Sequence, residues 1–124
     1  MTLENGKKII ACDFDGTLCT INYPECGELI EGAKEVVNRL YDAGNYIIIW
    51  TCRWEDTAEL AKEFLEKHGI KYHRFNEHHP DLIQKYGNDT RKISADTYID
   101  DRQLGGLPTW SEIEKILESQ GLFD

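Results

Sequence analysis

Residues 8–18 read Lys8-Ile9-Ile10-Ala11-Cys12-Asp13-Phe14-Asp15-Gly16-Thr17-Leu18, an apolar run that ends in two aspartates and a Gly-Thr pair. A continuous apolar run is typical of a strand buried on both faces, as in a parallel sheet. Side chains two apart on a strand point the same way, so Asp13 and Asp15 leave the strand end together. Two adjacent carboxylates repel each other in a low dielectric unless a cation compensates them. The segment therefore predicts a metal-dependent site at the carboxyl end of a central strand, where open α/β sheets bind ligands.

Strand and helix patterns alternate along the rest of the chain. Apolar segments predict strands, stripes at helical spacing predict helices, and polar segments predict loops. The expected strands are 46–50, 71–75 and 95–99, the expected helices are 29–41, 56–69 and one after 109, and the expected irregular segments are 19–27 and 76–89. Two capping-box patterns, Asp56 with Glu59 and Thr109 with Glu112, would open helices. This alternation predicts an α/β fold with a single Rossmann-like three-layer domain over residues 1–124 and a central parallel sheet.

The net charge and the distribution of apolar residues argue against two classes of function, nucleic-acid backbone binding and membrane insertion. The chain has 23 acidic and 14 basic side chains, which give a formal charge of −9. This balance argues against tight binding to nucleic-acid backbones, which needs stripes of Lys and Arg. No stretch approaches the roughly 20 apolar residues that span a bilayer, and residues 1–8 lack the apolar core of a signal peptide. We expect a soluble cytoplasmic protein that does not enter a membrane.

The four cysteines, at positions 12, 19, 26 and 52, have irregular spacings and form no C-x-x-C pair. A disulfide framework or a metal cluster would need regular spacing or a secreted context. The sequence therefore predicts four reduced thiols.

Polar residues also follow the other predicted strands. Thr51 comes directly after the strand 46–50, and Asp100 and Asp101 come directly after the last strand. Lys92 lies before that strand, at about the start of the last crossover. Because the carboxyl ends of parallel strands share one edge, these side chains can converge with the first aspartate pair.

This ordered set resembles the four motifs of the haloacid dehalogenase-like (HAD) superfamily of phosphohydrolases. The motifs appear as Asp13-Phe14-Asp15-Gly16-Thr17, Thr51, Lys92 and Asp100-Asp101. The resemblance implies a Mg²⁺-dependent phosphatase that hydrolyses phosphoric monoesters through an aspartyl-phosphate. The gaps between the motifs are too short for a large cap domain, so the chain is similar to small cap-less members. Such members act on large substrates or close the site by oligomerising, and we expect a homo-oligomer here.

The resemblance also implies catalytic roles. Asp13 would be the nucleophile, and Asp15 would protonate the leaving oxygen and then deprotonate the hydrolytic water. Thr51 would donate a hydrogen bond to a phosphoryl oxygen, and Lys92 would supply positive charge to the transferring group. The substrate would be a phosphorylated small molecule, such as a nucleotide or a sugar phosphate, or the phosphorylated end of a larger molecule.

The same resemblance implies a set of ligands for the metal. Mg²⁺ prefers oxygen ligands, and Asp13, Asp100 and the backbone carbonyl of Asp15 would supply them. Asp101 is a candidate ligand as well, either directly or through water, and the alternative is a structural role as a helix or turn cap.

The sequence gives less specific indications for the roles of other residues near these motifs. Arg53 could reach a second anionic group of the substrate, while Trp54 could either stack on the substrate or cover the sheet edge. His78 and His79 are adjacent, and because adjacent residues rarely point to one metal we expect structural or solvent-exposed roles for them. Arg91 is a weaker candidate for the cationic role.

Two other function classes stay open at this stage. A receiver-like phosphoacceptor domain also places aspartates, a Thr and a Lys on a parallel sheet, although the order of these residues along the chain disfavours it. A non-catalytic module that binds phosphate or a partner could keep the same fold. The presence of every expected catalytic residue type argues against loss of activity.

Overall fold

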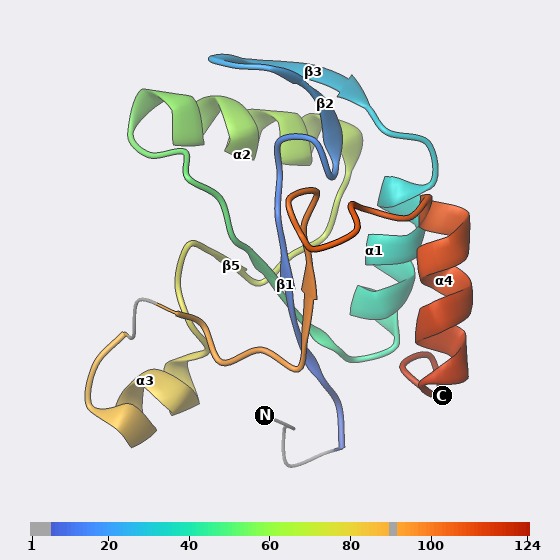
Figure 1. Ribbon diagram of the computed structural model, residues 1–124. Coiled ribbons are helices and arrows are strands. Elements are labelled where there is room, and N and C mark those ends of the chain that lie inside the picture. The colour runs from blue at the N-terminus through green and yellow to red at the C-terminus, as the bar shows by residue number, and fades with distance from the viewer. Residues whose placement is uncertain (1–5, 90–91) are drawn as a thin grey trace.

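The computed structural model describes residues 6–89 and 92–124 (Figure 1). The cationic candidate Arg91 and the first five residues, on which the localisation prediction partly rests, lie outside this part of the chain. Three strands come first, and helices and strands alternate after them: β1 (Ile9–Cys12), β2 (Cys19–Asn22), β3 (Glu25–Leu29), α1 (Ala33–Asp42), β4 (Tyr46–Ile49), α2 (Asp56–His68), β5 (Arg74–Phe75), α3 (Pro80–Tyr86), β6 (Thr97–Ile99) and α4 (Trp110–Ser119).

The central sheet has the strand order β5-β4-β1-β6, and every pairing in it is parallel. Strand β1 is an inner strand, where Ile10 pairs with Ile47 of β4 on one side and with Thr97 of β6 on the other. All four residues of β1 are buried, as its continuous apolar sequence predicts. The predicted central parallel sheet is therefore confirmed, with the apolar run at its centre.

Helices cover both faces of the sheet. Alternate residues of β1 and β4, such as Ile10 and Ile47, belong to a large apolar core that also contains side chains of α1, α2 and α4. The residues between them, such as Ile9 and Ile48, pack in a smaller cluster with Leu82 of α3. This division follows the two-residue repeat of strand side chains. The result is a three-layer Rossmann-like α/β domain, and no large cap domain is present among the described residues.

The segment expected to be irregular at 19–27 is instead an antiparallel hairpin of β2 and β3, which is drawn above α2 in Figure 1. Most residues of the hairpin are exposed or half-buried, so its sequence carries no alternating apolar pattern. Helix α1 accordingly begins at Ala33 rather than at residue 29, because Leu29 belongs to β3 and Gly32 has a φ of 85° at the helix start.

Two other boundaries differ from the prediction. Helix α2 begins at Asp56, but no side chain caps it and its N-cap is Glu55, so the expected capping box is absent there. The loop expected at 76–89 contains helix α3. The side chain of His79 caps the start of this helix, because it accepts a hydrogen bond from the backbone N–H of Asp81. A seven-residue helix with a single buried residue has too short an apolar pattern to be recognised in the sequence.

Several predictions about the elements are confirmed. Helix α4 begins with the expected capping box between Thr109 and Glu112, and α2 is followed by Gly69 with a φ of 69°. All four cysteines are free thiols. Among the described helices, none combines the length and the apolar character required to cross a bilayer.

Candidate functional site

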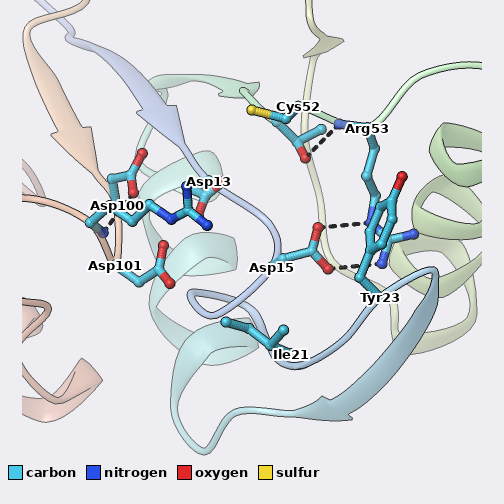
Figure 2. Close-up of a pocket in the computed structure, with 10 residues that line it drawn as sticks. Asp13, Asp15, Ile21, Tyr23, Cys52, Arg53, Asp100 and Asp101 are labelled. Carbon is cyan, nitrogen blue, oxygen red and sulfur yellow. Dashed lines mark hydrogen bonds and ion pairs between the residues drawn. The ribbon is translucent and has the colours of Figure 1, made fainter.

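The carboxyl ends of three adjacent strands meet at one edge of the sheet. Asp13 follows β1, Thr51 follows β4 and Asp100 follows β6. A cavity of about 290 Å³ opens at this edge (Figure 2). Its lining residues are Asp13, Asp15, Ile21, Tyr23, Thr51, Cys52, Arg53, Asp100, Asp101 and Arg102. The cavity thus brings together six of the eight residues predicted for the site, and leaves out Trp54 and Lys92.

An acidic cluster lies on one side of the cavity. Asp13, Asp100 and Asp101 each offer a carboxylate oxygen, and these oxygens lie within 4.8 Å of one another. The close approach of Asp101 depends on Gly16, because a Cβ atom at this position would overlap the Asp101 carboxylate. Gly16 also has a φ of 79°, which favours glycine. The glycine of the first motif therefore gives Asp101 room beside the loop.

The cluster perturbs the acid–base behaviour of Asp13. The pKa of Asp13 is raised from 3.8 to about 7, first by burial, then by a hydrogen bond with Asp101 and by the charge of Asp100. Three carboxylates at this spacing are stable together when a proton or a cation compensates their charge. An all-oxygen donor set fits Mg²⁺, which prefers such ligands. The residues present therefore fit the predicted metal, with Asp101 placed beside the other two carboxylates.

Thr17 connects the first motif to the last. Its buried hydroxyl donates to Asp13 Oδ2 at 3.2 Å and accepts from the backbone N–H of Asp101 at 3.1 Å. Its backbone carbonyl accepts from the indole N–H of Trp110 at 2.9 Å. These bonds fix the spacing between the ends of β1 and β6, so Thr17 has a structural role.

Thr51 is held from two directions. Its backbone N–H donates to Asn76 Oδ1 at 2.8 Å, and its hydroxyl accepts from the backbone N–H of Arg53 at 3.2 Å. The Asn76 amide also donates to the Arg53 carbonyl at 3.1 Å. Sequence reasoning missed Asn76, which has a φ of 56° after β5 and braces the 51–53 segment from the neighbouring strand.

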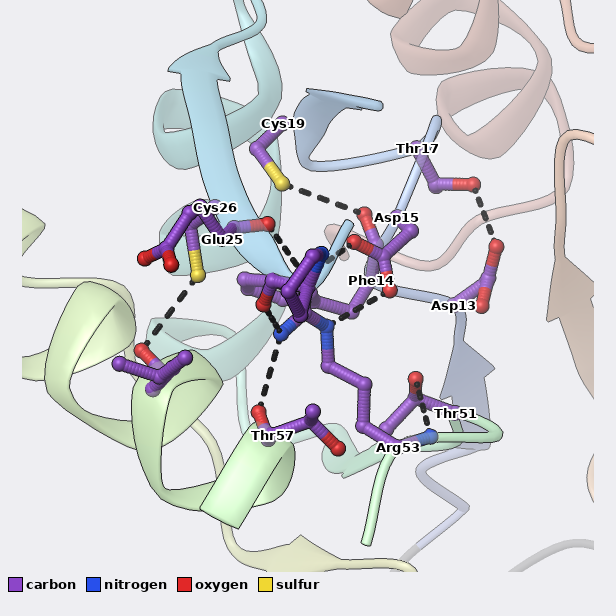
Figure 3. Close-up of polar contacts among 12 residues, drawn as sticks. Asp13, Phe14, Asp15, Thr17, Cys19, Glu25, Cys26, Thr51, Arg53 and Thr57 are labelled. Carbon is purple, nitrogen blue, oxygen red and sulfur yellow. Dashed lines mark hydrogen bonds and ion pairs between the residues drawn. The ribbon is translucent and has the colours of Figure 1, made fainter. Parts of the chain in front are cut away.

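Arg53 is almost fully buried, with 1% of its surface exposed. Its Nε and Nη2 donate to the two carboxylate oxygens of Asp15, both at 2.8 Å (Figure 3). The remaining N–H groups donate to three backbone carbonyls, those of Pro24 (2.8 Å), Glu25 (2.7 Å) and Thr57 (3.0 Å). The five N–H donors of the guanidinium are therefore all used within the protein.

The contacts of Arg53 and Trp54 differ from the predicted substrate contacts. With its donors committed, Arg53 has none left for an anionic group of a substrate, and the geometry favours a role in positioning Asp15. Trp54 is 73% exposed and does not line the cavity, so it neither covers the sheet edge nor contacts the site. The sequence places both residues close to Thr51 but does not indicate which way their side chains point.

Besides Arg53, the cavity is lined by a second cationic residue, Arg102, which sequence reasoning did not select. Its backbone N–H donates to Asp100 Oδ1 at 2.9 Å, and none of the ion pairs among the described residues involves its guanidinium. Lys92 is exposed, and its Nζ lies 5.8 Å from the centre of the Tyr98 ring. The signal for Arg102 was its place directly after the Asp100-Asp101 pair.

The adjacent histidines have structural positions. His78 is 1% exposed, and its Nε2 accepts from the backbone N–H of Ser94 at 3.1 Å. His79 accepts from the backbone N–H of Asp81 at the start of α3. Neither histidine lines the cavity, in agreement with the structural role expected for the pair.

Fold and site together define a Rossmann-like α/β domain with an acidic cavity at the carboxyl edge of its parallel sheet. The chain is similar to a solved conserved protein from Bacteroides thetaiotaomicron, with 32% sequence identity, a TM-score of 0.83 and coverage of 92% of each chain. At this identity and coverage, the chain belongs to the same family as the Bacteroides protein.

A second solved structure with a similar fold is the Pnkp1/Rnl/Hen1 RNA repair complex. Sequence identity is 21% and the TM-score is 0.57, over 83% of this chain and 39% of the other. This similarity concerns the fold alone. No protein-family model and no curated protein matches the sequence.

Proposed function

We propose that the protein is a Mg²⁺-dependent phosphatase of the HAD type, which hydrolyses phosphoric monoesters through an aspartyl-phosphate on Asp13. The observation that carries this proposal is the arrangement at the end of β1. Asp13 lines an open cavity next to Asp100 and Asp101, and Asp15 lines the same cavity two residues further on. Carboxylates that could serve as nucleophile, as metal ligands and as proton-transfer group therefore lie together at one place.

Asp13 would act in its ionised form. One carboxylate oxygen attacks phosphorus, which forms the acyl-phosphate bond while the P–O bond to the alcohol breaks. When bound at Asp13, Asp100 and Asp101, together with the Asp15 backbone carbonyl, Mg²⁺ supplies positive charge to the transferring phosphoryl group. Asp13 then needs no separate base, because deprotonation of its own carboxyl generates the nucleophile.

Asp15 would move the protons. It donates a proton to the leaving oxygen as the alcohol departs, and then accepts a proton from the water that attacks the aspartyl-phosphate. The Asp13 carboxylate and inorganic phosphate are the products of that second step. The double hydrogen bond to Arg53 fixes the direction in which the Asp15 carboxylate faces. A carboxylate paired in this way suits the second of the two steps, in which Asp15 accepts a proton.

Thr51 and Arg102 would bind the phosphoryl group. The Thr51 oxygen accepts a hydrogen bond from the Arg53 backbone, so its own O–H can donate toward the cavity. The Arg102 guanidinium can form charge-assisted hydrogen bonds with phosphoryl oxygens. In this proposal Arg102 provides the positive charge that the resemblance to the HAD motifs implies for Lys92.

The test is release of phosphate from an aryl phosphate, measured with Mg²⁺ and with a chelator. We expect release by the native protein to require Mg²⁺ and to fall at least about a thousandfold in Asp13→Asn, which is nearly isosteric. Asp81→Asn is the matched control, because Asp81 is an exposed aspartate of α3 that does not line the cavity. Metal-dependent hydrolysis retained by a folded Asp13→Asn variant would contradict the mechanism. No release by a well-folded native protein would favour the non-catalytic binding module.

A further inference from the structure

We propose that the β2–β3 hairpin forms the wall of the site that contacts the alcohol portion of the substrate, and that it selects phosphoric monoesters whose alcohol carries an aromatic or apolar group. This inference rests on the proposed function and names the substrate class of the same site. It is carried by three observations: the position of Asp15, the contacts of Arg53 and the apolar side chains of the hairpin.

The position of Asp15 locates the leaving group. A general acid must lie within hydrogen-bond reach of the oxygen that it protonates, about 2.6–3.2 Å between heavy atoms. The ester oxygen and the first atoms of the alcohol therefore lie beside Asp15. In Figure 2, Asp15 is on the side of the cavity that faces Tyr23 and Arg53, away from Asp100 and Asp101.

Arg53 ties this acid to the hairpin. The same guanidinium that holds Asp15 donates to the backbone carbonyls of Pro24 and Glu25, at 2.8 and 2.7 Å. These two residues lie at the turn between β2 and β3 and at the start of β3. The Tyr23 ring lies against the guanidinium, with its centre 5.1 Å from Arg53 Cζ. The hairpin is therefore fixed next to the leaving group.

The cavity-lining side chains of the hairpin are apolar or aromatic. Ile21 and Tyr23 line the cavity and are 65% and 61% exposed, whereas Glu25 and Glu28 of the hairpin do not line it. An exposed apolar surface is covered favourably by an apolar group, while a polyol would lose hydrogen bonds to water at the same surface. The chemistry of this wall thus fits an aromatic or apolar alcohol better than a sugar.

The test compares phenethyl phosphate with glycerol 3-phosphate in the presence of Mg²⁺, because the leaving group is a primary alcohol in both. We expect kcat/KM of the native protein to be about five- to tenfold higher for phenethyl phosphate, from the apolar area that the hairpin covers. Tyr23→Ala and Ile21→Ala should each reduce this ratio, and together bring it close to one. Tyr86→Ala and Ile116→Ala are matched controls, because these exposed side chains lie on α3 and α4 and do not line the cavity.

A binding measurement keeps the inference separate from the proposed activity. Calorimetry with Mg²⁺ should show tighter binding of benzylphosphonate than of methylphosphonate, with the difference reduced in Tyr23→Ala and lost when Ile21→Ala is added. Selectivity that is absent in the native protein, or equal in native and Tyr23→Ala protein, would overturn the inference even if hydrolysis is confirmed. If Tyr23→Ala instead removes a concentration-dependent dimer and leaves selectivity intact, the hairpin is an interface between copies and the proposal is wrong.

Discussion

Asp13 is subject to two opposing requirements. Burial and the neighbouring carboxylates favour its protonated form, with a pKa of about 7, whereas attack on phosphorus requires the ionised form. A divalent cation among the three carboxylates would resolve this conflict, because it favours ionised ligands. The crowded aspartates are thus consistent with a site that is completed by metal.

This conflict predicts a pH-dependent effect of Mg²⁺ on stability. In the unfolded chain Asp13 is ionised above about pH 4, while in the metal-free folded protein it holds its proton up to about pH 7. The contribution of this group to the free energy of unfolding therefore falls as pH rises through that range. Because Mg²⁺ displaces the proton, its stabilising effect should grow over the same range.

Thermal denaturation at a fixed Mg²⁺ concentration measures this effect. The rise in Tm caused by Mg²⁺ should be larger at about pH 7.5 than at about pH 5.5. In Asp13→Asn the rise should be smaller and nearly independent of pH. An equal rise in Tm at both pH values in the native protein would show that Asp13 does not bind the metal.

The two cationic candidates, Arg102 and Lys92, are distinguished by kinetics. Arg102 lines the cavity and Lys92 does not, so Arg102→Ala should raise KM for an aryl phosphate by about tenfold or more, as expected for the loss of a charged hydrogen bond. Lys92→Ala should change kcat/KM by less than about threefold, as expected of a surface substitution. A larger loss of kcat/KM in Lys92→Ala would show that Lys92 supplies the positive charge, as the motif order suggests. It would contradict the choice of Arg102, which is based on the lining of the cavity.

Among the elements, the side chain of Arg53 connects three segments. It bonds Asp15 in the loop after β1, the turn of the β2–β3 hairpin, and the Thr57 carbonyl at the start of α2 (Figure 3). Its Cζ also lies 5.3 Å from the centre of the Phe14 ring and 5.1 Å from the centre of the Tyr23 ring. A displacement of any one of these segments would therefore shift the carboxylate of Asp15 through Arg53.

Replacing Arg53 tests this connection. Arg53→Ala leaves the half-buried Asp15 carboxylate and three backbone carbonyls without this partner. We expect the substitution to reduce the free energy of unfolding by about 3 kcal/mol. Arg53→Lys keeps the charge but cannot form the double hydrogen bond, so it should lower kcat by about a hundredfold with a smaller change in KM.

Added guanidinium should partly restore kcat in a folded Arg53→Ala variant and have no such effect on native protein. Arg39→Ala is the matched control, because Arg39 of α1 is bonded on the surface to Glu114 and Glu118. Full activity of Arg53→Lys would show that the geometry of the guanidinium is not required.

The elements that the sequence predicted well are those with a clear apolar repeat. Strands β1 and β4 and helices α2 and α4 are buried along one stripe or on both faces, and each was predicted close to its observed position. The β2–β3 hairpin and helix α3 were missed because few of their side chains enter the core. The position of the hairpin depends instead on polar contacts from a distant residue, Arg53, which no local pattern records.

For the molecule as a whole, topology accounts for the part of the site that could be predicted. Asp13, Thr51 and Asp100 converge because they end neighbouring parallel strands, and this rule needs no knowledge of side-chain conformations. Lys92 precedes its strand within a crossover, and the rule does not fix its direction. The open cavity is consistent with the cap-less architecture, and the expected homo-oligomer stays a prediction.

The most direct test of phosphoryl transfer to Asp13 is the mass of the peptide that spans residues 8–18. Native, Asp13→Asn and Asp15→Asn proteins would be quenched with acid shortly after mixing with an aryl phosphate and Mg²⁺. An aryl leaving group needs little protonation, so Asp15→Asn should still form the intermediate but hydrolyse it slowly. We predict that one phosphoryl group accumulates on Asp13 in Asp15→Asn and that none is found in Asp13→Asn. Steady hydrolysis with no phosphorylated peptide in any of the proteins, or a phosphoryl group on another residue, would contradict the account.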